Sequence, residues 1–179
     1  MVDVKALLFV RLRKSVRIDP SARSILLHQY IWIRCCPKRE LNFESHLPQT
    51  IELVDRHPNQ IFIVDHIAKP SIRKKALDSW RQQLIELASR PNVYCKLSGM
   101  VTEAHWDLWT EQELIPYFET VLKAFGCKRT MFGSDWPVVN LAATYGRWLE
   151  TVQRALSQFS EEERAWVFAG PQLKPTTSD

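Results

Sequence analysis

The chain has 179 residues, of which 45% are hydrophobic, 11% aromatic and 25% charged, with a formal net charge of +4. These proportions are close to those of ordinary globular domains and exclude a chain that is disordered throughout. No apolar run approaches the roughly 20 residues of a membrane span. We therefore expect a cytoplasmic protein with no membrane partner.

The positive charge is concentrated at the N-terminus. Residues 1–40 contain nine Lys or Arg against three acidic residues, whereas residues 41–179 contain fifteen basic and seventeen acidic residues. Such a segment is typical of a mitochondrial transit peptide or a nucleic-acid patch, but it also fits unrelated sequence in front of the domain. We interpret residues 1–40 as an atypical basic segment and expect no nucleic-acid partner, because aromatics at a recognisable spacing are missing; mitochondrial location remains the alternative.

The cysteines form neither a Cys-x-x-Cys pair nor an evenly spaced disulfide framework. Cys35 and Cys36 are adjacent, while Cys95 and Cys127 stand alone. The adjacent pair could be redox-active or simply two small apolar side chains. We expect all four cysteines to be reduced thiols, as is usual in the cytoplasm.

From Leu41 onward, short apolar runs alternate with longer amphipathic stretches, which predicts four successive βα units. The expected strands are residues 40–44, 60–65, 93–97 and 129–133. The expected helices are residues 48–57, 72–89, 111–125, 143–156 and 160–168. Gly126 is the expected stop of the third helix, and Ser160 with Glu163 predicts a capping box on the last.

Ionisable side chains follow two of these strands. Residues 132–137 read Phe-Gly-Ser-Asp-Trp-Pro, and the apolar run at 61–64 ends in Asp65 and His66. In α/β enzymes the carboxyl ends of strands carry bases and metal ligands. In the strand at 93–97, Lys96 and Ser98 face the opposite side from Cys95, and Lys96 needs a carboxylate partner, either Asp65 or Asp135, because an unpaired buried ammonium is costly.

Three motifs together resemble a known family: Val-Asp-His-Ile-Ala-Lys-Pro at 64–70, Asn-Val-Tyr-Cys-Lys-Leu-Ser-Gly at 92–99, and residues 132–137. They are similar to the amidohydrolase-2 family, in the branch of L-fuconolactonase-like and 2-pyrone-4,6-dicarboxylate lactonase-like hydrolases. The resemblance covers residues 41–168, and residues 169–179 form a polar tail. It implies an α/β fold, a partial (β/α)8 TIM barrel of about four C-terminal βα units.

A complete barrel needs roughly 250 residues, and the His-x-His pair of the family's first strand does not occur in this sequence. We therefore expect a shortened form with weak or no activity. The resemblance implies hydrolysis of a cyclic ester, such as a sugar-acid lactone, as the small-molecule substrate. The alternative is a non-catalytic half-barrel that acts by associating with itself or another chain through open sheet edges.

The resemblance also implies residue roles. Asp135 corresponds to the general base that activates water, and His66 to a residue that binds substrate or metal. Both would be ligands of a divalent metal, Zn or Mn, only if other residues complete the site. The alternatives are a structural carboxylate that caps the following loop and a structural histidine.

Three further residues are candidates for substrate binding. Lys69 could bind a substrate carboxylate or be a solvated loop charge. Trp106 and Trp136, on expected loops at the same rim, could wall a pocket for a sugar or aromatic ring, or pack on the barrel mouth.

Overall fold

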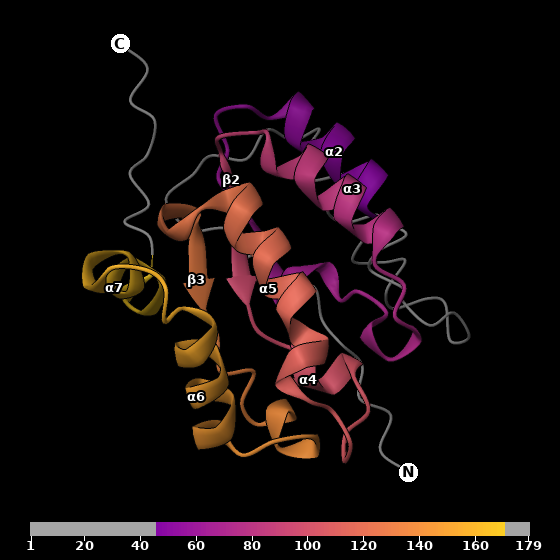
Figure 1. The fold of residues 1–179 in the computed structure, drawn as a ribbon. Coiled ribbons are helices and arrows are strands. Elements are labelled where there is room, and N and C mark those ends of the chain that lie inside the picture. The colour runs from indigo at the N-terminus through magenta and orange to yellow at the C-terminus, as the bar shows by residue number, and fades with distance from the viewer. Residues whose placement is uncertain (1–45, 171–179) are drawn as a thin grey trace.

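A computed structural model describes residues 46–170 (Figure 1). In this part of the chain, three short strands form one parallel sheet in the order β1-β2-β3. The strands are β1 (Phe62–Val64), β2 (Val93–Leu97) and β3 (Thr130–Phe132). The register pairs Val64 with Cys95 and Leu97 with Phe132. Since parallel neighbours need a crossover connection, the sheet is built from consecutive βα units, as the sequence predicted.

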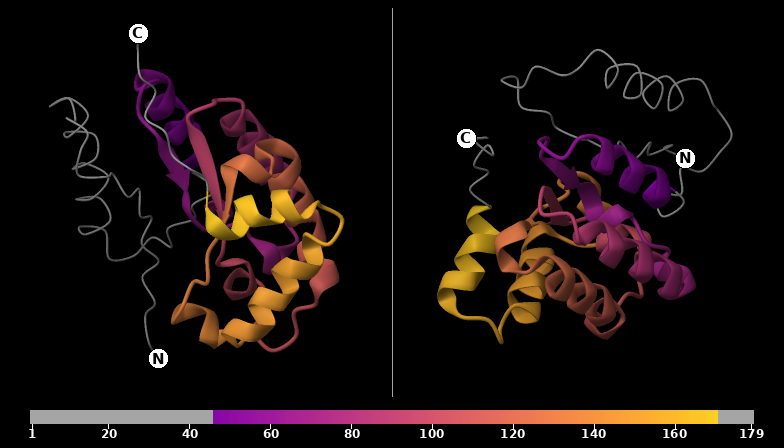
Figure 2. Two further views of the ribbon diagram at one scale, coloured as in Figure 1. Left: turned by 90° about the vertical axis from the view of Figure 1, so that its left-hand side faces the viewer. Right: turned by 90° about the horizontal axis from the view of Figure 1, so that it is seen from above.

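The helices are α2 (Leu47–Arg56), α3 (Asp78–Ala88), α4 (Met100–Glu103), α5 (Glu111–Phe125), α6 (Tyr145–Ala155) and α7 (Glu161–Ala169). Helices α3 and α5 lie side by side against one face of the sheet, α2 contacts α3, and α7 packs against β3 (Figures 1 and 2). In residues 46–170 no helix has the length and apolar character needed to cross a membrane.

The core lies between the sheet and these helices. Cys95 and Leu97 of β2 are fully buried there, with Trp80 from α3 and Leu114 from α5. Lys96 alternates to the other face and is only half-buried, as the strand periodicity predicted. Each fully buried side chain of this size contributes about 1.5–3 kcal/mol, so the helix-facing side of the sheet anchors the strand ends.

The predicted capping box of α7 is confirmed. The Ser160 hydroxyl accepts a hydrogen bond from the Glu163 backbone N–H, and the Glu163 carboxylate accepts one from the Ser160 backbone N–H. Helix α5 begins with the same device at Thr110 and Glu113. Gly126 ends α5 as expected, and its N–H donates to the Leu122 carbonyl.

Two predicted helices are shorter in the structure. The helix expected at 72–89 begins only at Asp78, because Ile72 is buried separately in a short turn, Ile72–Lys74, and Lys75 has a φ of +53°. The helix expected at 143–156 is α6, preceded by the separate turn Val138–Leu141. The strand expected at 40–44 lies outside the described residues.

Candidate functional site

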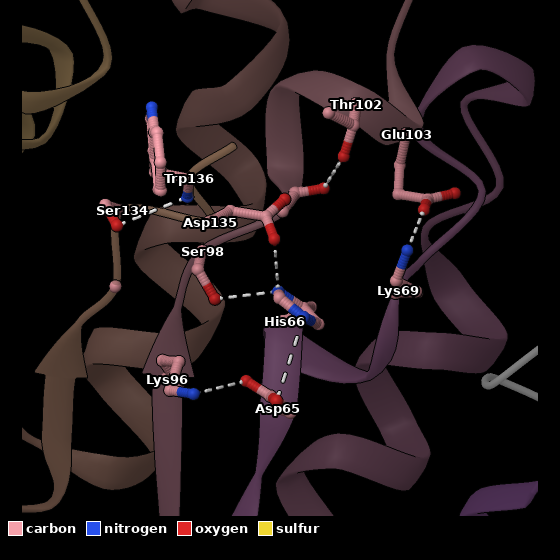
Figure 3. A network of polar contacts seen from close by, with 12 residues as sticks. Asp65, His66, Lys69, Lys96, Ser98, Thr102, Glu103, Ser134, Asp135 and Trp136 are labelled. Atoms are coloured by element: carbon pink, nitrogen blue, oxygen red, sulfur yellow. Dashed lines mark hydrogen bonds and ion pairs between the residues drawn. The ribbon is translucent and has the colours of Figure 1, made fainter. Parts of the chain in front are cut away.

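The carboxyl ends of all three strands bring polar side chains to one edge of the sheet (Figure 3). Asp65 and His66 follow β1, Ser98 follows β2, and Asp135 lies three residues beyond β3. Parallel strands end on the same side of a sheet, so these side chains converge although up to 70 positions separate them in the sequence.

The segment after β1 has an unusual backbone. Four consecutive non-glycine residues, 66–69, have φ values between +45° and +60°. Single residues tolerate this region at a cost of roughly 1–2 kcal/mol each, and a β-branched residue such as Ile67 is an outlier there. Neighbouring contacts must therefore hold the segment in place.

Those contacts come from the core behind the segment. The side chain of Ile67 is fully buried, and the indole N–H of Trp80 donates a 2.7 Å hydrogen bond to the Ile67 carbonyl. Trp80 lies on α3 and is itself fully buried. Helix α3 thus fixes the turn that carries His66.

Asp135 also has a left-handed backbone, with a φ of +56°. The loop after it is capped by other groups: the Ser134 hydroxyl accepts from the Trp136 N–H, and the Asp135 backbone carbonyl accepts from the Val139 N–H. These bonds do not use the Asp135 carboxylate, which is directed toward His66 (Figure 3).

Two glycines make room for this arrangement. A Cβ atom at Gly99 would lie 2.8 Å from Nδ1 of His66, and a Cβ at Gly133 would lie 2.8 Å from the Lys96 side chain. Gly99 also has a φ of +66°. Both positions need the absence of a side chain, because imidazole and lysine stem occupy the space.

His66 is the centre of the site. Its Nδ1 atom lies 2.9 Å from the Ser98 hydroxyl and 3.7 Å from Oδ1 of Asp135, and its Nε2 atom lies 3.7 Å from Oδ2 of Asp65. The first contact is a hydrogen bond; the other two are longer than hydrogen bonds. The imidazole therefore stands between two carboxylates, anchored by Ser98.

Burial favours the neutral forms of both His66 and Asp135. It lowers the pKa of His66, and the fields of Asp65 and Asp135 only partly oppose the shift. It raises the pKa of the Asp135 carboxyl, against the opposing fields of His66 and Lys69. A base with a raised pKa is better matched to proton transfer near neutral pH.

Lys96 pairs with Asp65, as one of the two predicted partners. Its Nζ atom lies 2.8 Å from Oδ1 of Asp65, whose side chain is 4% exposed. The pair neutralises a carboxylate that would otherwise be buried alone. Asp135, the other predicted partner of Lys96, lies beside His66 instead.

The candidate substrate-binding residues differ in placement. Lys69 lies near the His66 and Asp135 pair and binds Glu103, with 2.8 Å between Nζ and Oε1. Trp136 stands next to Asp135 and is 68% exposed. Trp106 is 42% exposed on the loop after α4, where its indole N–H donates to the Thr102 carbonyl. Both indoles have exposed surface.

The described side chains supply two candidate metal ligands. Two ligands of one Zn²⁺ ion, each about 2.0–2.2 Å from it, lie roughly 3–3.5 Å apart, close to the 3.7 Å between His66 and Asp135. However, ligation through Nδ1 would compete with the Ser98 hydrogen bond, and residues 46–170 hold no group of three or more His, Cys, Asp or Glu suited to a metal ion. This part of the chain does not complete a metal site.

Two residues of the site make contacts that were not predicted from the sequence. Glu103 carries no local signal, because only the return of α4 toward the strand ends brings it to Lys69. Ser98 was expected only to face the side opposite Cys95, together with Lys96, and its bond to His66 depends on the backbone of the turn at 66–69.

Comparison with known proteins places this geometry in context. The sequence model of a family described as Amidohydrolase matches residues 32–170. An L-fucono-1,5-lactonase of Burkholderia ambifaria is 36% identical over 86% of this chain and 52% of its own length. One from Burkholderia multivorans is 41% identical over 73% of this chain and 47% of its own. The chain thus spans about half the length of these curated relatives.

The fold is similar to solved structures as well. A crystal structure of an amidohydrolase from Burkholderia multivorans with bound zinc has a TM-score of 0.68 and 41% identity, and the match covers 72% of this chain and 48% of that one. Together with the parallel sheet, this similarity identifies the fold as part of a (β/α)8 barrel, as the sequence predicted.

Proposed function

Because this chain belongs to the amidohydrolase family, we propose that it hydrolyses a sugar-acid lactone with Asp135 as general base and His66 as hydrogen-bond donor. The observation that carries the proposal is the approach of these two side chains from different strand ends to 3.7 Å. The 36% and 41% identity to L-fucono-1,5-lactonases supports a cyclic ester as the substrate.

In the proposed reaction, a water oxygen attacks the lactone carbonyl carbon while Asp135 takes the water proton. The neutral imidazole of His66 donates its N–H to the carbonyl oxygen as negative charge develops there. The ring C–O bond then breaks, and the proton on Asp135 passes to the leaving alkoxide. The product is the open hydroxy acid.

Substrate contacts in the proposal come from the rim. The exposed indoles of Trp136 and Trp106 offer apolar faces on which a sugar ring can pack. Lys69 offers an ammonium beside the reacting centre. A divalent metal enters the proposal only as a component to be added in the assay, since residues 46–170 supply two candidate ligands.

The test is hydrolysis of L-fucono-1,5-lactone and a panel of related sugar lactones by the full chain, with and without Zn²⁺ or Mn²⁺. Acid release would be followed by a pH indicator and corrected for spontaneous opening, after a cooperative thermal transition has shown that the chain is folded. We expect turnover above the spontaneous rate. A folded protein that accelerates none of these lactones, with or without metal, would contradict the proposal.

A second candidate function is association through the sheet. In residues 46–170, β1 and β3 are the outer strands of the sheet, and outer strands present backbone groups that can pair with another chain. Light scattering of the purified protein would measure its mass. A monomer that hydrolyses lactones would remove this candidate. The cytoplasmic location expected from the sequence stays a prediction.

A further inference from the structure

Lys69 and Glu103 form a half-buried ion pair beside the candidate reacting centre. The Lys69 ammonium lies 2.8 Å from the Glu103 carboxylate, and the two side chains are 14% and 29% exposed. Lys69 ends the left-handed turn after β1, and Glu103 is the last residue of α4. Figure 3 shows the pair at the same edge of the sheet as His66 and Asp135.

The charges of Lys69 and Glu103 act on the Asp135 carboxyl group. Burial is the largest cause of the raised pKa of Asp135, but Lys69 lowers that pKa and Glu103 raises it. Figure 3 shows Lys69 and Glu103 at the same edge of the sheet as the carboxylate that would activate water, and charges so placed act on it. A sugar-sized substrate bound between Asp135 and this pair would contact both.

The ammonium groups of this cluster are already matched by carboxylates. Lys96 pairs with Asp65, and Lys69 pairs with Glu103. Asp135 adds a third carboxylate. A ligand bearing its own carboxylate would thus enter a site where neither lysine carries unbalanced charge and Asp135 repels it.

A neutral ligand with hydroxyl groups can bind both members of the ion pair without being repelled by Asp135. A hydroxyl group can donate and accept at once, so neighbouring hydroxyls of a sugar ring can accept from an ammonium and donate to a carboxylate. Lys69 and Glu103 present these two groups side by side, half-buried, where hydrogen bonds to charged groups are strong.

We propose that Lys69 and Glu103 form a hydroxyl-recognition site that selects neutral, polyhydroxylated lactones over lactones bearing a free carboxylate, with Glu103 as the specificity-determining residue. The inference rests on the proposed lactone hydrolysis and narrows its substrate class. It also assigns Lys69 to hydroxyl groups, because its ammonium is neutralised by Glu103.

The test compares galactonolactone, which is neutral, with galactarolactone, which carries a free carboxylate. Their dissociation constants would be measured by calorimetry in the non-hydrolysing variant Asp135→Asn, and their kcat/KM values in the otherwise unchanged chain. We expect the neutral lactone to be favoured by both measures. Glu103→Gln should reduce this preference about tenfold, whereas Glu103→Asp should retain most of it.

Glu52→Gln is the matched control, because Glu52 forms an exposed ion pair with Arg56 on α2, outside the site, and should leave the preference unchanged. Equal binding of the two lactones, or binding of neither, would overturn the inference. The same holds if Glu103→Gln leaves the preference intact. If the neutral lactone binds selectively but is not hydrolysed, the proposed function fails while the recognition site stands.

Discussion

His66 and Asp135 lie at the strand ends in backbone conformations that most side chains avoid, with φ values of +50° and +56°. The motifs predicted which residue types follow the strands, and the resemblance implied that the two side chains act in one site, but neither predicted the geometry of their approach. The meeting depends on the turn at 66–69 and on the space left by Gly99. Neither the turn nor the space at Gly99 could be predicted from sequence periodicity, because both depend on contacts between distant segments.

The neutral state of His66 makes folding stability depend on pH. Burial lowers its pKa below the ordinary value of 6.5, whereas unfolding restores that value. Below pH 6.5 the unfolded chain therefore binds more protons at this position than the folded chain. This contribution to the free energy of unfolding is complete above 6.5 and is lost as pH falls toward the pKa of the folded state.

We expect urea unfolding to show a smaller loss of stability between about pH 7.5 and pH 5.5 in His66→Gln than in the unchanged chain. His105→Gln, at an exposed position, is the matched control and should show the full loss. Equal losses in all three proteins would mean that the folded state does not disfavour protonation of His66.

At the scale of elements, helices were predicted best where local signals agree. Helix α5 has the predicted bounds, and the capping box on α7 is confirmed. The turn at 66–69 had no such signal, because its residues individually favour negative φ and only burial of Ile67 and the Trp80 hydrogen bond hold it. Local propensity therefore predicts the scaffold better than the site.

The variants Gly99→Ala and Gly126→Ala test the space around the imidazole. Both glycines have positive φ, but Gly99 has a ψ of +8°, where an alanine costs roughly 1–2 kcal/mol, and Gly126 has a ψ of 168°, where an alanine costs roughly 1–3 kcal/mol. Only a Cβ at 99 would meet His66, at 2.8 Å, whereas a Cβ at 126 has nothing within 4 Å. We expect both variants to lose stability, but only Gly99→Ala to lose most of its turnover.

Denaturant unfolding and lactone turnover measure the two effects separately. Gly126→Ala should show the backbone cost alone and keep its turnover. If the two folded variants show the same turnover, the close approach of Gly99 to His66 does not matter for the site.

On the scale of the whole molecule, stability and chemistry lie at opposite ends of the sheet. Arg129 directly precedes β3, and its guanidinium donates to the carbonyls of Ala88, Arg90 and Val93 and also to Ala124 at the end of α5. It thereby ties the ends of α3 and α5 to β2. The site, by contrast, lies past the carboxyl ends of the strands, as in barrel enzymes generally.

Arg129→Lys removes the planar fork that satisfies these carbonyls. We expect a loss of about 2–4 kcal/mol in the free energy of unfolding, because several partly buried acceptors lose their donors. Arg154→Lys, on the surface ion pairs of α6, should change stability little. Turnover per folded molecule should be the same in both; a loss of turnover in folded Arg129→Lys would show that the two ends are coupled.

The order of strands and helices could be predicted from the sequence because apolar runs and turn residues are local features, whereas the barrel family was implied by the resemblance of three motifs to known hydrolases. The strand expected at 40–44 lies outside the described residues and stays a prediction, as do the boundaries at residues 40 and 168. Since the chain spans about half the length of its lactonase relatives, activity is the decisive question.

The most direct measurement is kcat/KM for L-fucono-1,5-lactone in the unchanged chain, in Asp135→Asn and in Asp78→Asn, an exposed control at the start of α3. Loss of a general base should lower the value by about a hundredfold to ten-thousandfold in Asp135→Asn, while Asp78→Asn retains it. Equal values in Asp135→Asn and the unchanged chain, with both proteins folded, would contradict the assignment of Asp135 as the base.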